Sequence, residues 1–397
     1  MIEFKVSAPG KVILFGEHAV VYGKTAVAAS LDLRTTIKFA ELPKSDSENI
    51  IKIEFPDVKL SLNLPLRVFL DYFFSDNFEY SSIKNKNQLH SCVTEFLNSI
   101  ENVIDRGDNE SVIKQQTLSL QAFFYLLVYI AYEEHIDIKE TSFHVHLSTE
   151  LNVGTGLGSS ASFAVCLAAC FLHWSLLQKG DHDTFNKDEL DKISMYALNC
   201  ERIMHESPSG IDNSVCTYGS VIKFSDKKLV DMLPHVSNLK ILLVNTKVTR
   251  STKDQVKRTA QLKDSSPTIV IPILDNINTL SRDAWETLRE ISSKANNATK
   301  NMEQEWYTML SSLIHVNQGL LNAIGASHPK LEIICAMAKT HSYAAKLTGA
   351  GGGGYAYVLL PPHIETKSIK FFSDQLEEKG FHVTTTSLGG SGVKIEH

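Results

Sequence analysis

Paired cysteines, a surplus of basic residues and long apolar runs are all missing from this chain. The six cysteines include no Cys-x-x-Cys spacing, so we expect reduced thiols in a reducing, cytoplasmic setting. The 39 basic side chains are outnumbered by 45 acidic ones, which argues against a general nucleic-acid binder. The most apolar windows, 118–132 and 161–177, are shorter than the roughly 20 residues that a bilayer requires. We therefore expect buried helices there and no membrane partner.

The chain divides into two regions of mixed secondary structure. Its 397 residues are enough for two domains with a large core. Short β-branched segments separated by turn residues predict strands over 4–55, and helices follow over 65–137. The alternating stretch "TSFHVHLST" (141–149) predicts another strand, and a long helix ends near residue 178. The pattern resets near residue 230 with the strand "SNLKILLVNT". We predict an α+β protein with domains 1–229 and 230–397.

A glycine-rich segment between the predicted strand and helix is the strongest local feature. Residues 154–160, "GTGLGSS", hold three glycines and two serines just before an apolar run. A helix beginning near Ser159 would direct unpaired N–H groups and the positive end of its dipole into this loop, which favours an anion. The hydroxyls of Ser159 and Ser160 suit helix capping, phosphate contact or Mg²⁺ ligation. Capping alone needs fewer special residues, so we predict a phosphate-binding loop, with a capped buried helix as the structural alternative.

Three better-known glycine motifs fit the chain poorly. Gly349, Gly351 and Gly354 match G-x-G-x-x-G, but they precede a strand, whereas a dinucleotide-binding turn must open a helix. The "GKT" at 23–25 resembles the end of a P-loop, yet His18 stands where that motif requires glycine. Residues 158–162 nearly spell the hydrolase nucleophile motif G-x-S-x-G but lack its last glycine.

Two further segments carry polar residues next to apolar ones. "APGKVILFGEHAVVYGK" (8–24) places Lys11, Glu17 and His18 in predicted turns, and "ERIMHESPSGIDNSV" (201–215) places Glu201 near a helix end and Asp212 in a predicted turn. Taken alone, these residues suit turn formation as well as catalysis.

A pair of histidines invites a metal interpretation. His144 and His146 would share one face of their strand, but no third ligand lies nearby in the sequence. We therefore expect no metal site there.

Together these segments, in this order across nearly the whole chain, resemble the signature regions of the GHMP small-molecule kinases, which act on galactose, homoserine, mevalonate and phosphomevalonate. "KVILFGEHAVVYGK", "ERIMHESPSGIDN" and "KLTGAGGGG" are most similar to the branch that phosphorylates mevalonate. The resemblance implies an N-terminal domain of the ribosomal protein S5 domain 2-like type, a ferredoxin-like C-terminal domain, and an active site in the cleft between them. It also implies phosphoryl transfer from ATP to the C5 hydroxyl of mevalonate, in isoprenoid and sterol biosynthesis.

The resemblance also implies roles for individual residues. Asp212 would be the catalytic base, and Lys11 would stabilise the developing charge. Ser160 and Glu201 would bind Mg²⁺. The residues expected to contact the nucleotide are Lys11, Asn63, Thr149, Gly154, Thr155, Gly156, Leu157, Gly158, Ser159 and Ser160. Those expected to contact mevalonate are Glu17, His18, Asp212, Thr252 and Gly349.

The resemblance further implies a homodimer and feedback inhibition by isoprenoid diphosphates. Two alternatives stay open: another GHMP kinase acting on phosphomevalonate or a sugar, and a catalytically inactive nucleotide-binding regulator.

Overall fold

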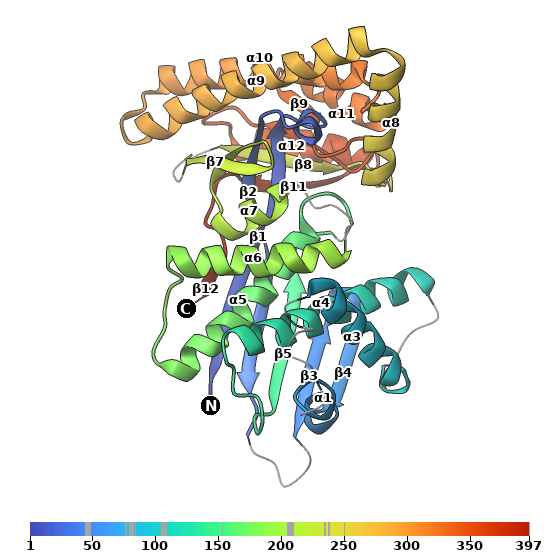
Figure 1. The fold of residues 1–397 in the computed structure, drawn as a ribbon. Coiled ribbons are helices and arrows are strands. Elements are labelled where there is room, and N and C mark those ends of the chain that lie inside the picture. The colour runs from blue at the N-terminus through green and yellow to red at the C-terminus, as the bar shows by residue number, and fades with distance from the viewer. Residues whose placement is uncertain are drawn as a thin grey trace.

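Two sheets organise the computed structural model, which is shown as a ribbon in Figure 1. The structure describes residues 1–43, 49–75, 78, 83, 85–104, 109–152, 154–204, 210–233, 236, 239–249 and 251–396. The strands of the main path of the first sheet are, in spatial order, β12 (Lys394–Glu396), β1 (Glu3–Phe15), β2 (Ala26–Glu41), β5 (Phe143–Thr149), β3 (Ile50–Phe55) and β4 (Leu60–Pro65). The hairpin of β6 (Val221–Ser225) and β7 (Lys228–Leu233) extends this sheet by pairing with the beginning of β2, whereas β5 pairs with its later residues.

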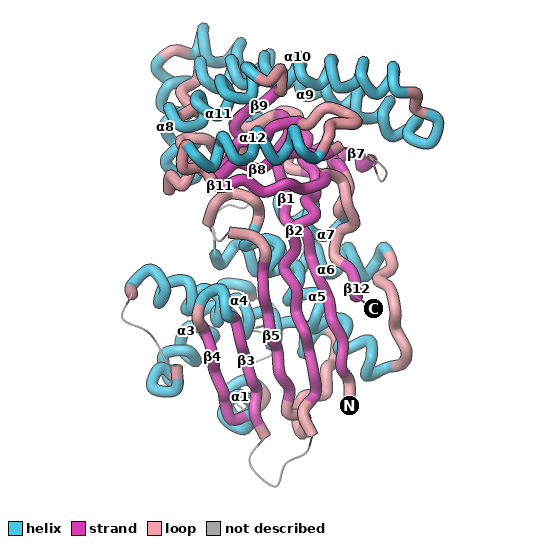
Figure 2. The backbone as a smooth tube through the Cα atoms, turned by 180° about the vertical axis from the view of Figure 1, so that it is seen from behind, coloured by secondary structure: helices cyan, strands magenta, loops and turns pink. Residues whose placement is uncertain are grey.

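Helices cover one face of the first sheet, and Figure 2 views the same strands from the side on which no described helix covers β5, β3 and β4. The covering helices are α1 (Leu66–Phe73), α3 (Lys86–Ser99), α4 (Glu110–Glu133), α5 (Ser159–Lys179) and α6 (Lys187–Met204). The short helix α7 (Ile211–Tyr218) packs against α5 and β1. The connections include η1 (Ala19–Tyr22), η2 (Pro56–Val58) and η3 (Glu101–Val103).

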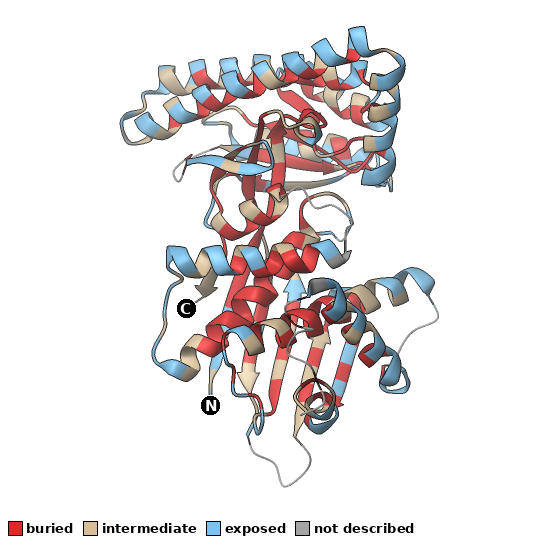
Figure 3. Cartoon of the chain, in the orientation of Figure 1, coloured by how far each residue is buried: buried red, intermediate tan, exposed pale blue. Residues whose placement is uncertain are grey.

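The helix α5 is the centre of the larger core, as the burial colouring of Figure 3 shows. Its apolar side chains contact β1, β2, α4 and α6, and Trp174 is fully buried. By length and apolarity alone this helix would also span a bilayer, but most of its apolar stretch is buried inside the protein. The predicted buried helix over 161–177 is therefore confirmed.

The second sheet has four antiparallel strands, in the order β11 (His382–Ser387), β8 (Lys240–Asn245), β10 (Tyr355–Leu359) and β9 (Ala344–Leu347). Five helices pack with it: α8 (Thr252–Ser265), α9 (Pro267–Lys294), α10 (Lys300–Ala323), α11 (Pro329–Thr340) and α12 (Thr366–Glu378), with η4 (Ala295–Asn297) joining α9 to α10. A second apolar cluster joins β8 and β10 to β1 and β2, so the two sheets share buried side chains.

Two local predictions were wrong. The short, separate strands expected over 4–55 are replaced within 26–41 by the single long strand β2, because Asp32–Arg34 in its middle include no glycine or proline that would end a strand. Asp212, expected in a turn, lies in the helix α7, which follows Gly210 with its left-handed φ of 84°. Eight residues are too few to show a reliable helical period.

The end of the chain returns to the first sheet. The strand β12 pairs with β1, and Arg34 on β2 secures it by donating hydrogen bonds to the carbonyls of Ser391 and Gly392 and to both oxygens of Ser7. The strand β7 also extends across residue 230. The division into 1–229 and 230–397 therefore stays a prediction, and the last strand lies with the first part of the chain.

Arg34→Met should destabilise the protein by about 3 kcal/mol, because it leaves several half-buried oxygens without a charged donor. The measurement is urea denaturation, together with hydrogen exchange at Ile395, which should accelerate. Arg67→Met removes an exposed arginine from an exposed pair with Asp71 and is the matched control, expected to change stability by less than about 0.5 kcal/mol. Equal effects of the two substitutions would contradict this role of Arg34.

Candidate active site

The glycine-rich loop joins β5 to α5, as predicted, and is packed onto β1. Gly154, Gly156 and Gly158 all have positive φ, and Gly158 is the residue before the first turn of α5. The backbone N–H of Lys11 donates to the carbonyl of Leu157 at 2.9 Å. A β-carbon on Gly158 would lie 2.7 Å from Cγ of Lys11. Glycine is therefore required at 158 both for backbone conformation and to leave room for the lysine.

Lys11 and Asp212 form an ion pair beside this loop. The predicted turn position of Lys11 was wrong, because it lies inside β1, with only 5% of its side chain exposed. Its Nζ is 3.1 Å from Oδ1 of Asp212, which lies in the first turn of α7. The Asp212 side chain is 35% exposed, so this carboxylate is accessible to a small molecule while the lysine beneath it is fixed.

Glu201 is the second acidic group of this cluster. It lies in the last turn of α6, and only 3% of the residue is exposed. Burial, together with the charge of Asp212, raises the pKa of Glu201 to about 8, although Lys11 acts in the opposite direction. Two carboxylates thus share one ammonium group. The two carboxyl groups and the half-buried hydroxyl residue Ser160, in the first turn of α5, are oxygen donors of the kind that Mg²⁺ prefers.

Glu17 is engaged in a buried ion pair. Its carboxylate contacts the ammonium of Lys346 on β9, and Asn317 donates to it at 3.4 Å. Burial raises the pKa of Glu17 and lowers that of Lys346, and the mutual attraction of the pair opposes both shifts. The sequence analysis missed Lys346, although a lysine inside the apolar segment "AAKL" is an unusual feature that could have pointed to a buried partner.

His18, just before η1, contacts two residues from the part of the chain that carries the second sheet. Its Nε2 lies 3.0 Å from the carbonyl of Ala350, and its Nδ1 lies 3.0 Å from Oγ1 of Thr259 on α8. These contacts make Glu17 and His18 positioning residues, and a direct contact of either with a substrate stays a prediction.

The second glycine cluster is packed tightly against its neighbours. Gly349 and Gly351–Gly354 all have positive φ. A β-carbon would lie 1.9 Å from the carbonyl oxygen of Ala326 at Gly351, and 2.8 Å from Val248 at Gly353. Thr348, just before the cluster, exchanges hydrogen bonds with the backbone of Ile13, two residues beyond Lys11. The cluster is thereby held next to β1.

Two further predicted contact residues, Thr149 and Thr252, lie at the ends of other elements. Thr149 ends β5, and its hydroxyl bonds to Oγ1 of Thr35 and to the N–H of Leu151, so it shapes the start of the loop. Thr252 is the exposed first residue of α8.

Asn63 lies apart from this group. Asn63 on β4 pairs with Lys52 on β3, and Lys52 pairs with His144 on β5. His144 lies five residues before Thr149, where β5 ends. That offset is roughly 16 Å along the sheet, so the structure does not bring Asn63 to the loop.

Gly158→Ala should destabilise the protein by about 1–3 kcal/mol more than Gly154→Ala does. Both glycines have left-handed φ values near 75°, so both substitutions introduce similar backbone strain. Only position 158 adds overpacking against Lys11, because no atom of the described residues lies within 4 Å of the new β-carbon at 154. Chemical denaturation of the two variants measures the difference. Equal losses would mean that Lys11 does not depend on the empty space at Gly158.

In metal-free buffer, Glu201→Gln should gain stability relative to the unsubstituted protein as the pH rises from about 4.5 to about 8. The folded protein keeps the Glu201 proton where the unfolded chain has lost it, so this group's contribution is full below the unfolded pKa and is lost as the pH passes the folded pKa. The expected change is on the order of 1 kcal/mol per pH unit. Urea denaturation across this range tests it, and a difference independent of pH would contradict it.

Comparisons with known proteins agree with this architecture. Two family models match the chain: GHMP kinases N terminal domain over residues 124–220, and GHMP kinases C terminal over residues 298–372. The chain is 35% identical to the mevalonate kinase of Candida albicans, with 99% of this chain and 90% of that protein covered. It is 33% identical to the mevalonate kinase of Homo sapiens, with 98% and 94% covered.

Solved structures show the same fold. The mevalonate kinase of Methanococcus jannaschii matches with a TM-score of 0.66 and 21% identity, covering 98% of each chain. The L. major mevalonate kinase, solved in complex with R-mevalonate, also matches with a TM-score of 0.66, at 20% identity, covering 98% of this chain and 97% of that one. The predicted α+β, two-domain GHMP kinase fold is thus confirmed. With full-length relatives above 30% identity, the chain belongs to the mevalonate kinase family of the GHMP kinases.

Proposed function

We propose that this chain transfers the γ-phosphoryl group of ATP to the C5 hydroxyl of mevalonate, giving ADP and 5-phosphomevalonate in isoprenoid and sterol biosynthesis. The observation that carries the proposal is the accessible Asp212 carboxylate, paired with a buried Lys11 directly beside the glycine-rich loop. Full-length similarity to proteins named mevalonate kinases supports the choice of acceptor.

The chemistry follows from the positions of these groups. In the transfer, the oxygen on C5 forms a bond to the γ-phosphorus as the bond between that phosphorus and the β,γ-bridging oxygen breaks. Asp212 accepts the hydroxyl proton, and it must be ionised to do so. Lys11 holds that carboxylate in place and offsets negative charge on the transferring group. The N–H groups at the start of α5 would bind the phosphates. This suits the reaction, because phosphoryl transfer depends mainly on positioning and charge neutralisation.

Mg²⁺ fits the acidic cluster, with Ser160 and Glu201 as the residues that would hold it. When bound, the ion would neutralise phosphate charge. Glu201 is nearly fully buried, and within the described part of the chain only the Lys11 ammonium, shared with Asp212, opposes its charge; this environment favours a cation beside its carboxylate.

A coupled ADP-release assay tests the activity with mevalonate, phosphomevalonate, galactose and homoserine as acceptors. We expect substantial turnover with Mg-ATP only for mevalonate. Faster turnover of phosphomevalonate or galactose would support another GHMP kinase activity. ATP binding without turnover of any acceptor would support the inactive regulator, although the presence of Lys11, Ser160, Glu201 and Asp212 together favours an enzyme.

Three further properties belong to this proposal. Farnesyl and geranyl diphosphates should compete with ATP for the loop at 154–160, and inhibition that is noncompetitive with ATP would contradict this.

A homodimer should appear in light scattering at micromolar concentration, where a monomer mass would exclude it. A reducing cytoplasmic location fits six cysteines that are all unpaired in the described residues, and fractionation of cells tests it.

Asp212→Asn should lower kcat by about two to four orders of magnitude, the range a positioned base supplies, and leave ATP affinity little changed. Lys11→Met should also lower kcat. The double variant should be less impaired than the product of the two losses, because the pair acts as a unit. Single-turnover phosphoryl transfer at saturating substrates measures each effect.

Asp264→Asn is the matched control for this experiment, since Asp264 also pairs with a lysine but lies exposed on α8. It should leave turnover unchanged. Asn is nearly isosteric with Asp, so the thermal stability of Asp212→Asn should hold. A single-turnover rate within about threefold of the unsubstituted enzyme would remove the catalytic role of Asp212, because that change is below the range of general-base catalysis.

A further inference from the structure

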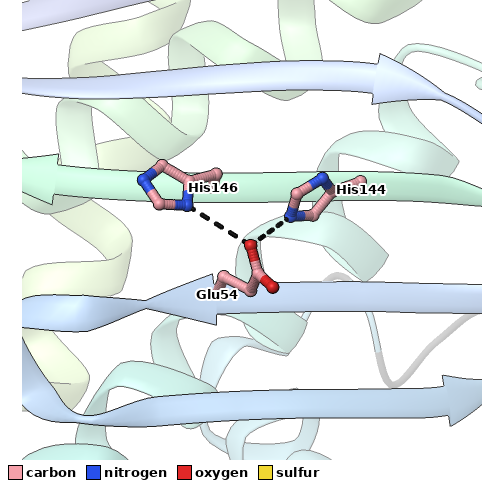
Figure 4. A group of neighbouring side chains, drawn as sticks. All are labelled: Glu54, His144 and His146. Carbon is pink, nitrogen blue, oxygen red and sulfur yellow. Dashed lines mark hydrogen bonds and ion pairs between the residues drawn. The ribbon is translucent and has the colours of Figure 1, made fainter.

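Glu54, His144 and His146 meet on the open face of the first sheet, away from the helices (Figure 4). The two histidines alternate along β5 with Phe143, Val145 and Leu147, which are buried on the opposite face. No third ligand lies near these histidines in the sequence, so no metal site was expected there. The parallel pairing of β3 with β5 brings Glu54, which is far away along the chain, level with His146 and so supplies a third candidate ligand.

The donor atoms of these residues converge on one point. Oε2 of Glu54 is 2.9 Å from Nε2 of His144 and 3.4 Å from Nδ1 of His146. All three donor atoms lie within 4.8 Å of one another. Ligands bound to one Zn²⁺ ion at 2.0–2.2 Å in tetrahedral geometry are roughly 3.3 Å apart, so only small side-chain movements are needed to admit the ion.

We propose that Glu54, His144 and His146 form a binding site for a divalent transition-metal ion, with Zn²⁺ as the best-fitting occupant. Two imidazoles and one carboxylate are a Zn²⁺ ligand set, whereas Mg²⁺ and Ca²⁺ prefer oxygen donors alone. The three side chains are one-quarter to one-third exposed, so an ion has access from solvent and a water molecule can complete the coordination.

The backbone holds this set in place before any ion binds. All three residues lie on hydrogen-bonded neighbouring strands, which fix their positions more firmly than loops would. Lys52 donates to Oε1 of Glu54 at 2.9 Å and leaves Oε2 facing the imidazoles. This contact orients the Glu54 carboxylate toward the two histidines before an ion arrives.

Other histidines of the described residues lack this convergence. Nδ1 of His173 contacts Nδ1 of His182, whose Nε2 contacts Glu189. Both ring nitrogens of His182 are therefore engaged, one with His173 and the other with Glu189. Because these contacts lie on different sides of the ring, the three side chains do not converge on one ion. His363 has Glu303 as a carboxylate partner but has no second imidazole beside it.

Calorimetric titration of metal-depleted, full-length protein with ZnCl₂ tests the proposal. We expect one site that is weakened more than about tenfold in His144→Ala, His146→Ala and Glu54→Gln, since loss of a ligand should exceed the effect of losing a second-shell partner. His363→Ala is the matched control and should bind Zn²⁺ as the unsubstituted protein does. Zn²⁺ should also raise the Tm of the unsubstituted protein more than that of Glu54→Gln.

Co²⁺ substitution identifies the ligands independently of stability. Bound at this site, Co²⁺ should show visible d–d absorption without the thiolate charge-transfer band that cysteine ligands produce, and Glu54→Gln should lose that absorption. The near-isosteric Glu54→Gln keeps the test valid if a histidine variant fails to fold. No Zn²⁺ binding at concentrations up to about 100 μM, a thiolate band, or binding that survives all three substitutions would each overturn the proposal.

Discussion

The contact between Gly158 and the side chain of Lys11 is the constraint on which the rest of the reaction site depends. Lys11 occupies the space that any side chain at 158 would fill, and its backbone N–H is bonded to the same loop. From that position its ammonium reaches Asp212 on α7. The absence of a side chain at position 158 thus allows β1, the glycine-rich loop and α7 to meet at Lys11. The strand then carries this register toward the second domain, where Thr348 and Tyr357 bond to the backbone of Ile13 and Leu14.

The balance of buried charge distinguishes the two acidic centres near β1. Glu17 and Lys346 form a closed pair, with one carboxylate matched by one ammonium and additional hydrogen bonds from Asn317 and to the carbonyl of Leu347. Such a pair contributes orientation more than stability, because desolvation offsets much of the attraction. The cluster of Lys11, Glu201 and Asp212 has two carboxyl groups for one ammonium, and without a metal Glu201 keeps its proton up to a pKa of about 8. A cation can replace that proton, which is why we propose Mg²⁺ for this second centre.

The sequence predicted those parts of the molecule whose signals are local. The strand ending at Thr149, the glycine-rich loop and the apolar helix from Ser159 follow directly from residue order, and so does the membership of Lys11, Glu201 and Asp212 in separate polar segments. The partners of buried charges could not be predicted, since Lys346 meets Glu17, and Glu54 meets His146, only through the packing of distant strands. The return of β12 to β1 is likewise a tertiary effect, secured by Arg34 and invisible in three terminal residues.

The two glycine clusters look alike in sequence but differ in what surrounds them. At Gly351 and Gly353 the space beside the α-carbon is filled by the protein's own backbone and by Val248, so those glycines are required for packing. At Gly154 none of the residues that the structure describes fills the corresponding space, and the glycine is exposed. A glycine with a positive φ and no neighbour costs conformational entropy without improving the packing of the folded protein. An approaching ligand would account for that choice, which agrees with the proposed nucleotide-binding role of the first cluster, whereas the packing of the second cluster is explained by its own neighbours.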